Sequence, residues 1–288
     1  MPTYTDASGL VVTYYVWPVP APRAVIQIAH GVGEHAQRYA ALAAALNLAG
    51  YTVYADDHLG HGQTGLDQHG GDHTRLGRLG AGGLRAAVAG VHQLSGIIRL
   101  ANPNLPLVLL GHSWGSFMVQ MIVNQHAAEY DAVVLSGTAY RWPGYLDGGD
   151  LNRKHQTLGT TGVEWLSRDP AVAAAFVADP LTTAAPLAKL FGVREAARLF
   201  GRPAKNLPTD LPMLVLIGGD DTVGGERSAL KLVNAYVKRS GLRDVRLIVY
   251  PGARHEVFNE TNRSEVIGDL VAWLDEHLPP MPTPGGTP

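Results

Sequence analysis

The sequence contains no cysteine, and this absence excludes several kinds of chemistry. Its 288 residues can form no disulfide, no thiolate nucleophile and no cysteine-ligated metal site. Long hydrophobic runs are also missing, because no segment reaches the ~18 apolar residues of a membrane helix. The N-terminal MPTYTDASGL has neither the basic region nor the apolar stretch of a signal peptide. We therefore expect a cytoplasmic protein.

An excess of charge of one sign is absent as well. The formal net charge is -2, and charged residues make up 17% of the chain without a run of five or six like charges. This balance argues against a nucleic-acid partner. The length and the 46% of hydrophobic residues favour one packed domain with at most a modest insertion. These bounds leave small neutral substrates open.

Short apolar segments rich in β-branched residues alternate with longer amphipathic segments. The expected strands are 24–30, 51–55, 107–110, 132–137, 213–219 and 245–250, and the expected helices are 40–50, 83–100, 226–241 and 264–278. This alternation predicts an α/β fold with a mainly parallel, doubly wound sheet. The segment 10–17 has no helix after it, so we expect it to form an antiparallel edge hairpin with 24–30.

The alternation is interrupted between about Tyr140 and Pro208, where glycine and proline are frequent and helical stretches are short. We interpret 140–208 as an inserted helical cap between two parts of the core, 1–139 and 209–278. The final PPMPTPGGTP has no apolar face to bury, so residues 279–288 are expected to be a disordered tail.

The segment LVLLGHSWGSFMV at 107–119 holds a GxSxG sequence between an expected strand and an expected helix. Gly111 and Gly115 leave room for a tight turn that exposes the hydroxyl of Ser113 above the sheet. The helix that begins near Trp114 directs amide donors and its positive end toward that hydroxyl. The pattern predicts Ser113 as a nucleophile, and a glycine-rich turn with an incidental serine is the alternative.

A nucleophilic serine needs a general base and a carboxylate that orients the base. In α/β folds of this kind the expected chain order is Ser, Asp, His. Asp220 and Asp221 follow the strand at 213–219, and His255 follows the strand at 245–250, at the sheet edge where catalytic groups gather. We predict His255 as the base, whereas spacing alone does not separate Asp220 from Asp221.

Histidines and acids crowd the segment 56–73 in a way that could suggest a metal site. The residues concerned are Asp56, Asp57, His58, His61, His69 and His73. They have neither HExxH spacing nor a thiolate set, so we interpret the segment as a hydrogen-bonded turn and expect no metal. The glycines at 31–33 and 80–83 form neither GxGxxG nor a phosphate loop, so no cofactor is expected.

Five blocks of sequence resemble a known family when they are taken together. They are HGVGEHAQRY at 30–39, DDHLGHGQTG at 56–65, GHSWGS at 111–116, GGDDTVGG at 218–225 and YPGARHEVFNE at 250–260. In this order they are similar to the monoacylglycerol lipase and lysophospholipase-like branch of the α/β-hydrolases, of serine aminopeptidase S33 type. The resemblance covers roughly residues 8–278, and the segment 167–181 is similar to bacterial members.

The resemblance implies an α/β-hydrolase fold and a catalytic triad of Ser113, Asp221 and His255. It also implies groups around the triad: backbone amides of Val32 and Trp114 as an oxyanion hole, and His30, Gly31 and His112 at the substrate-binding site.

The activity that the resemblance implies is hydrolysis of acylglycerols or related esters through an acyl-enzyme. The segment 141–159 has few contiguous apolar residues to grip a long acyl chain, so a short-chain carboxylesterase stays open. A peptidase, amidase or acyltransferase with the same triad also stays open, as does a non-catalytic ligand-binding protein of this fold. The expected partner is a small ester or monoacylglycerol, with at most peripheral membrane contact through the cap.

Overall fold

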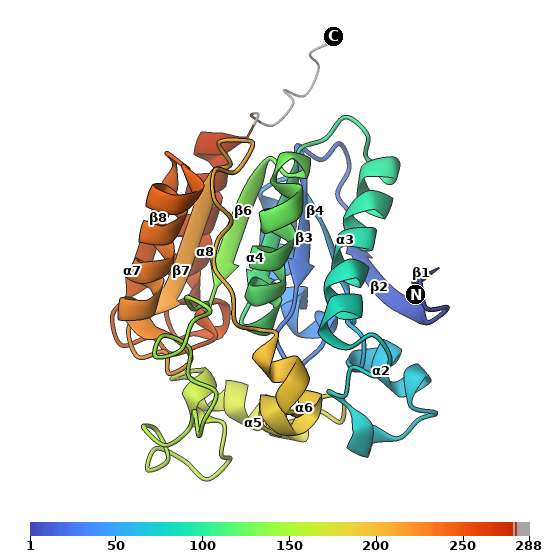
Figure 1. Ribbon diagram of the computed structural model, residues 1–288, viewed down its shortest axis with the longest axis vertical. Helices are drawn as coiled ribbons and strands as arrows, with labels where there is room; N and C mark the ends of the chain where they lie inside the picture. Colours follow the sequence, from blue (N-terminus) through green and yellow to red (C-terminus); the bar gives the residue numbers. More distant parts are fainter. Residues whose placement is uncertain (279, 281–288) are drawn as a thin grey trace.

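One eight-stranded sheet forms the centre of the computed structural model, which describes residues 1–278 and 280 (Figure 1). The strand order is β1-β2-β4-β3-β5-β6-β7-β8. The strands are β1 (Thr3–Thr5), β2 (Val11–Trp17), β3 (Ala24–Ala29), β4 (Tyr51–Asp56), β5 (Leu107–His112), β6 (Ala132–Ser136), β7 (Met213–Gly218) and β8 (Val245–Tyr250). Strands β3 to β8 are parallel, whereas β1 and β2 are antiparallel at one edge.

Helices cover both faces of this sheet (Figure 1). Helices α3 (Gly83–Ala101), α4 (Trp114–His126) and α7 (Gly225–Ala235) pack on one face, and α1 (Ala40–Leu48) and α8 (Arg263–His277) pack on the other. Side chains of β5 alternate between the two resulting cores, with Leu107 and Leu109 in one and Val108 and Leu110 in the other. Because both faces of the sheet are buried, its central strands are mostly apolar. The predicted doubly wound α/β fold is confirmed.

Shorter elements complete the described part of the chain. They are α2 (Gly62–Gln68), the 3-10 turns η1 (Ala36–Tyr39), η2 (His73–Arg75), η3 (Ala127–Glu129), η4 (Glu164–Leu166) and η6 (Val257–Asn259), and the π turn η5 (Tyr236–Ser240). Within residues 1–278 and 280, no helix has both the length and the apolar character needed to cross a bilayer.

The predicted partner of the segment 10–17 is wrong. This segment is β2, and it pairs antiparallel with β4, with Tyr14 opposite Asp56 and Trp17 opposite Val53. It cannot form a hairpin with β3, because β3 is bonded to β4 on one side and to β5 on the other. The short strand β1 was not predicted, and it extends the sheet beyond β2.

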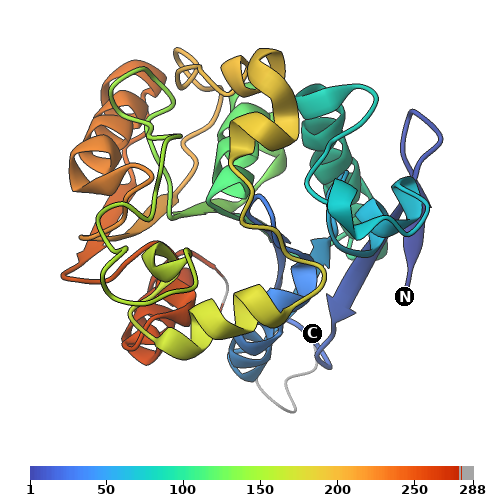
Figure 2. The same cartoon turned by 90° about the horizontal axis from the view of Figure 1, so that it is seen from below.

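Residues 140–208, which we call the insert, connect β6 to β7 beyond the carboxyl ends of the parallel strands (Figures 1 and 2). The insert contains α5 (Pro170–Ala178) and α6 (Leu187–Ala197). Helix α5 begins with proline at its first position, after Asp169, whose side chain accepts a hydrogen bond from the amide of Ala171 at 3.0 Å. The insert therefore covers the sheet edge at which the candidate catalytic residues were expected.

Packing inside the insert is partly separate from the core. Val163, Leu166, Ala173 and Phe176 form a small apolar cluster of their own, whereas Phe191 of α6 joins the main core. The bounds of the insert as a cap domain stay a prediction. The tail predicted at 279–288 lies outside the described residues, apart from Pro280.

Candidate active site

Ser113 stands in the tight turn between β5 and α4. Its φ of 53° and ψ of -124° lie outside the regions that a residue with a side chain usually adopts. The turn is fixed on both sides, because the amide of Ser113 donates to Ser136 O at 2.9 Å and its carbonyl accepts from Ser116 Oγ at 2.6 Å. The hydroxyl is thereby held at the N-terminal end of α4, where amides point outward.

The two glycines around Ser113 are required by close packing. A Cβ atom on Gly115 would lie 2.0 Å from the carbonyl oxygen of Ala29 in β3. One on Gly111 would lie 2.7 Å from the backbone of Gly115. The GxSxG sequence thus lets the turn and the start of α4 lie directly on the sheet.

His255 and Asp221 meet at the carboxyl edge of the sheet, after β8 and β7. Nδ1 of His255 lies 3.0 Å from both carboxylate oxygens of Asp221. Both side chains are buried, and Asp221 is fixed in turn by a 2.8 Å hydrogen bond from the amide of Val223. Burial opposes protonation of His255, but Asp221 outweighs it and raises the pKa of the imidazole.

The other side of the His255 imidazole, which carries Nε2, is surrounded by aromatic rings. Rings of His112 and Trp165 each lie 4.8 Å from it, centroid to centroid. Its Nε2 is buried and has no hydrogen-bond partner within the described residues. This nitrogen is therefore available to a reacting hydroxyl.

The structure brings Asp221, rather than Asp220, against His255. The carboxylate of Asp220 is 44% exposed and forms an ion pair with Lys154 at 2.7 Å. The hydrogen bond from that ammonium lowers the pKa of Asp220. The two neighbours thus have separate partners, which spacing along the chain did not reveal.

The loop that follows β3 passes beside Ser113. A Cβ atom on Gly31 would lie 3.1 Å from Cβ of Ser113, so the backbone here is close to the serine. The amide of Gly31 donates to Glu34 Oε1 at 2.6 Å. The amides of Val32 and Trp114 make no hydrogen bond to another described residue.

Two of the residues predicted at the substrate site are occupied by internal contacts. His30 is fully buried, with Nδ1 2.7 Å from Gly31 O and Nε2 accepting from the amide of His58 at 3.1 Å. Burial lowers the pKa of His30 well below its usual range, which keeps the ring neutral. His112 lies 3.2 Å from Ser136 Oγ, and burial lowers its pKa to about 4. Both rings support the loops around Ser113.

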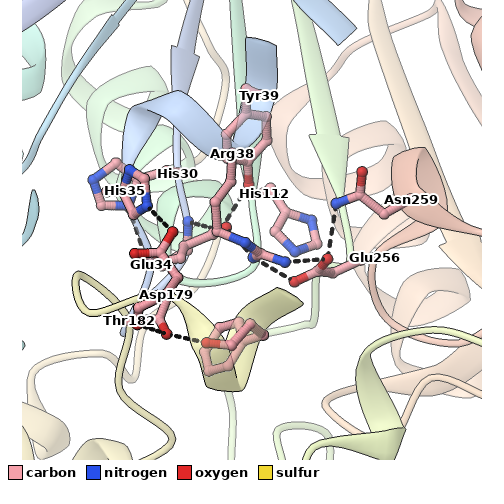
Figure 3. A network of polar contacts seen from close by, with 12 residues as sticks. His30, Glu34, His35, Arg38, Tyr39, His112, Asp179, Thr182, Glu256 and Asn259 are labelled. Carbon is pink, nitrogen blue, oxygen red and sulfur yellow. Dashed lines mark hydrogen bonds and ion pairs between the residues drawn. The ribbon is translucent and has the colours of Figure 1, made fainter. Parts of the chain in front are cut away.

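Beside these loops lies a buried polar network that the sequence analysis did not identify (Figure 3). Nη1 of Arg38 donates to Glu34 at 2.6 Å, and the guanidinium donates to both oxygens of Glu256 at 2.7 and 2.9 Å. Tyr39 donates to Glu34 Oε1 at 2.7 Å, and Asn259 donates to Glu256 at 2.8 Å. These residues belong to the sequence blocks 30–39 and 250–260. Arg38 and Glu256 are more than 200 positions apart, so no local sequence pattern could have predicted their contact.

The insert is attached to the same loop. Nε2 of His35 lies 2.8 Å from Asp179 Oδ2 at the end of α5 (Figure 3). The amide of Thr183 donates to Gly33 O at 2.8 Å. A displacement of the insert would therefore act directly on the loop that carries Val32.

Residues 56–73 are joined by hydrogen bonds and ring contacts. Asp57 accepts from the amides of Ala36 and Gln63 at 2.9 and 2.8 Å, and the rings of His30 and His58 stack at 3.8 Å. Their side chains do not form a ligand cluster. Within the described residues, a group that could hold a metal is His92, His126 and Glu129. It lies at the C-terminal end of α4, about 20 Å of helix from Ser113.

Comparisons with known proteins find a matching family and similar chains. A family model described as serine aminopeptidase, S33, matches residues 20–262. The chain is 34% identical to a monoacylglycerol lipase of Mycolicibacterium smegmatis, over 96% of this chain and 97% of the relative. It is 26% identical to the monoglyceride lipase of Homo sapiens, over 96% and 90% of the two chains.

A solved structure gives the same result for the fold. The carboxyl esterase of Bacillus coagulans, solved with glycerol, superposes with a TM-score of 0.83 at 25% identity. The superposition covers 96% of this chain and 97% of that one. With a family model matched over most of its length, the chain has the α/β-hydrolase fold and belongs to the serine aminopeptidase S33 family.

Proposed function

We propose that the protein hydrolyses carboxylic esters, with monoacylglycerols as substrates, through a triad of Ser113, His255 and Asp221. The observation that carries this proposal is the buried His255–Asp221 pair, whose free Nε2 lies at the sheet edge that also presents the strained turn of Ser113. An incidental serine would need neither that backbone conformation nor a base oriented by a buried carboxylate.

The reaction follows from these positions. Oγ of Ser113 attacks the ester carbonyl while Nε2 of His255 takes its proton, and Asp221 stabilises the imidazolium. The amides of Val32 and Trp114 stabilise the negative oxygen of the tetrahedral intermediate. Collapse of the intermediate expels the alcohol with the proton from His255 and leaves an acyl-enzyme. Water, deprotonated by His255, then releases the acid and restores Ser113.

The substrate class rests on similarity and on the surface of the insert. The relatives named above are lipases of monoacylglycerols, and the similarity to one of them spans nearly the whole chain. Large apolar side chains are exposed on the insert, at Trp142, Leu158, Val177, Val193 and Phe200. They would suit peripheral contact with a lipid surface.

Aminopeptidase activity is a second candidate because of the family description. Recognition of a free amino terminus calls for an unpaired carboxylate near the serine. The carboxylates of Glu34 and Glu256 are both paired with Arg38, which disfavours this candidate.

A hydrolysis series tests the proposal. It would compare p-nitrophenyl esters from acetate to palmitate, monoacylglycerols, a lysophospholipid and aminoacyl p-nitroanilides, with the wild type and Ser113→Ala. We expect a maximum on long-chain monoacylglycerol and a loss of about 10⁴-fold or more in Ser113→Ala. A maximum on short esters would make the protein a general carboxylesterase, and activity that survives Ser113→Ala would contradict the mechanism.

The adjacent aspartates provide a matched pair of variants. Asp221→Asn should lower kcat by about 10⁴-fold, because an amide favours the wrong tautomer of His255. Asp220→Asn should stay within about twofold of the wild type, because exposed ion pairs contribute little. Equal losses in the two variants would refute the assignment of Asp221.

A further inference from the structure

A single arginine joins the two loops that carry the candidate oxyanion donor and the candidate base. Arg38 lies in η1, after the loop that contains Val32, and Glu256 directly follows His255. The guanidinium makes a two-point contact with Glu256 and a third contact, at 2.6 Å, with Glu34 (Figure 3). One side chain thus connects segments that are more than 200 positions apart.

Glu34 fixes the backbone immediately before the candidate oxyanion donor. Its Oε1 accepts from the amide of Gly31 at 2.6 Å and from the hydroxyl of Tyr39 at 2.7 Å, while Oε2 is bound by Arg38. The carbonyl of Gly31 belongs to the same peptide unit as the amide of Val32, and it lies 2.7 Å from Nδ1 of His30. Because this unit is planar and trans, the amide of Val32 points away from the His30 ring.

Glu256 fixes the loop of the base in the same way. It is bound by Arg38 and by Asn259, and its own amide donates to Leu166 O of the insert at 2.7 Å. His255 precedes it, with an amide that donates to Trp165 O at 3.3 Å. The backbone on both sides of the His255 side chain is therefore anchored.

The three charged side chains are almost completely withdrawn from water. The exposed fractions are 4% for Glu34, 11% for Arg38 and 5% for Glu256. Burial opposes ionisation of Glu256, but the guanidinium outweighs it and lowers the pKa of this carboxyl to about 2. Well-packed apolar side chains are often at least as stabilising as a buried ion pair, so fold stability alone does not account for this network.

We propose that Arg38 is a positioning residue, which through Glu34 and Glu256 holds the oxyanion loop and His255 in a fixed relation to Ser113. This inference rests on the proposed function. Misplacement of donor or base by about 1 Å costs about 10²-fold in rate, so a fixed relation between the two loops acts on catalysis directly.

The network also has an electrostatic consequence for His255. The carboxylates that raise the pKa of its imidazole are Asp221 first, and then Glu256 and Glu34. The cation Arg38, which is bound to Glu256, carries the opposite charge, whereas the ring of His112 stays neutral because burial lowers its pKa to about 4. Removing the charge of Glu256 should therefore lower the pKa of His255, whereas loss of packing alone would not produce a shift of that sign.

Three variants test the proposal. Arg38→Met should lower kcat by about 10²-fold with KM within about threefold, because positioning affects the reaction more than binding. Arg38→Lys should recover about tenfold of that loss, because it keeps the charge without the two-point contact. Glu256→Gln, which keeps the shape of the side chain, should move the acid limb of the kcat/KM profile to lower pH.

Arg141 provides the matched control, because it is buried even more completely than Arg38, at 3% exposed, and lies outside the network. It donates to Gln120 Oε1 and to Leu199 O. Arg141→Lys should lower Tm while kcat and the acid limb stay as in the wild type. If folded Arg38→Met keeps kcat within about twofold, or if Glu256→Gln leaves the acid limb unmoved, the proposal is wrong. If Arg38→Met does not fold, the kcat of Arg38→Lys and the acid limb of Glu256→Gln test the proposal instead.

Labelling with a fluorophosphonate separates this inference from the proposed function. If the wild type is not labelled at Ser113, the proposed function fails, and with it the basis of the inference. If the wild type is labelled and Arg38→Met is labelled equally fast, only the role of Arg38 is refuted. We expect the Arg38→Met rate to be lower by the same factor as its kcat.

Discussion

Gly115 allows α4 to begin directly on the backbone of β3. Gly115→Ala would place a Cβ atom 2.0 Å from Ala29 O, and backbone atoms cannot move aside cheaply. We expect the free energy of unfolding to fall by about 2–4 kcal/mol, as urea denaturation would measure. Ester hydrolysis should fall as well, because Ser113 is displaced with the start of the helix.

Gly96 offers a control of the same chemistry in α3. A Cβ atom there meets nothing within 4 Å. Gly96→Ala should raise the free energy of unfolding by about 0.5–1 kcal/mol, because alanine favours a helix interior. A similar loss in both variants would show that the close approach at Gly115 is not the cause.

The raised pKa of His255 fixes the direction of the pH dependence. The base must be neutral to accept a proton, so kcat/KM should fall as the pH drops through this pKa. The acid limb should therefore lie above 6.5, the usual value for histidine, in a profile measured on a soluble ester. An acid limb below 6.5 would contradict the part assigned to Asp221.

Some residues of the candidate site can be predicted from the sequence, and others cannot. Ser113 and His255 follow from local patterns, because a tight turn needs glycines and because the candidate base follows a strand. The choice between Asp220 and Asp221 depends on burial, which spacing does not contain. Arg38 was not identified, since only the fold brings it to Glu256.

Among the elements, the strands were predictable and the pairing of β2 was not. Burial on both faces leaves mostly apolar runs at β3 to β7, and this signal is local. The neighbour of each strand depends on the order of the whole sheet. The segment 10–17 was therefore recognised as an edge segment but was assigned to β3 instead of β4.

Gln27 is a polar residue in the apolar strand β3, and it ties this strand to α3. Its amide donates to Val91 O at 2.7 Å, and its Oε1 accepts from Ser95 Oγ at 2.6 Å. Gln27→Leu should lower the free energy of unfolding by about 1 kcal/mol, because two buried hydrogen bonds are lost while Ser95 Oγ keeps Tyr130 as a partner at 2.8 Å. Adding Ser95→Ala should recover part of this loss in urea denaturation, whereas strict additivity would refute the coupling.

At the scale of the whole molecule, the candidate site is assembled from segments distributed over most of the chain. Ser113 follows a central strand, Asp221 follows β7 and His255 follows β8, which is at the edge of the sheet. The loop that contains Gly31 precedes Ser113 in the sequence and lies beside it. The insert follows Ser113 in the sequence and contacts His255 through Trp165. The site therefore depends on the completed sheet rather than on any one supersecondary unit.

This distribution has a consequence during synthesis of the chain. Ribosome-bound chains that have emerged only as far as β7 contain the nucleophile, but they lack both its base and the last strand that would hold that base. We expect such stalled chains to resist fluorophosphonate, and labelling to begin only when α8 has left the exit tunnel and β8 can dock. Reactivity of Ser113 would then time the final step of cotranslational folding, and early labelling would mean that the nucleophile is activated without His255.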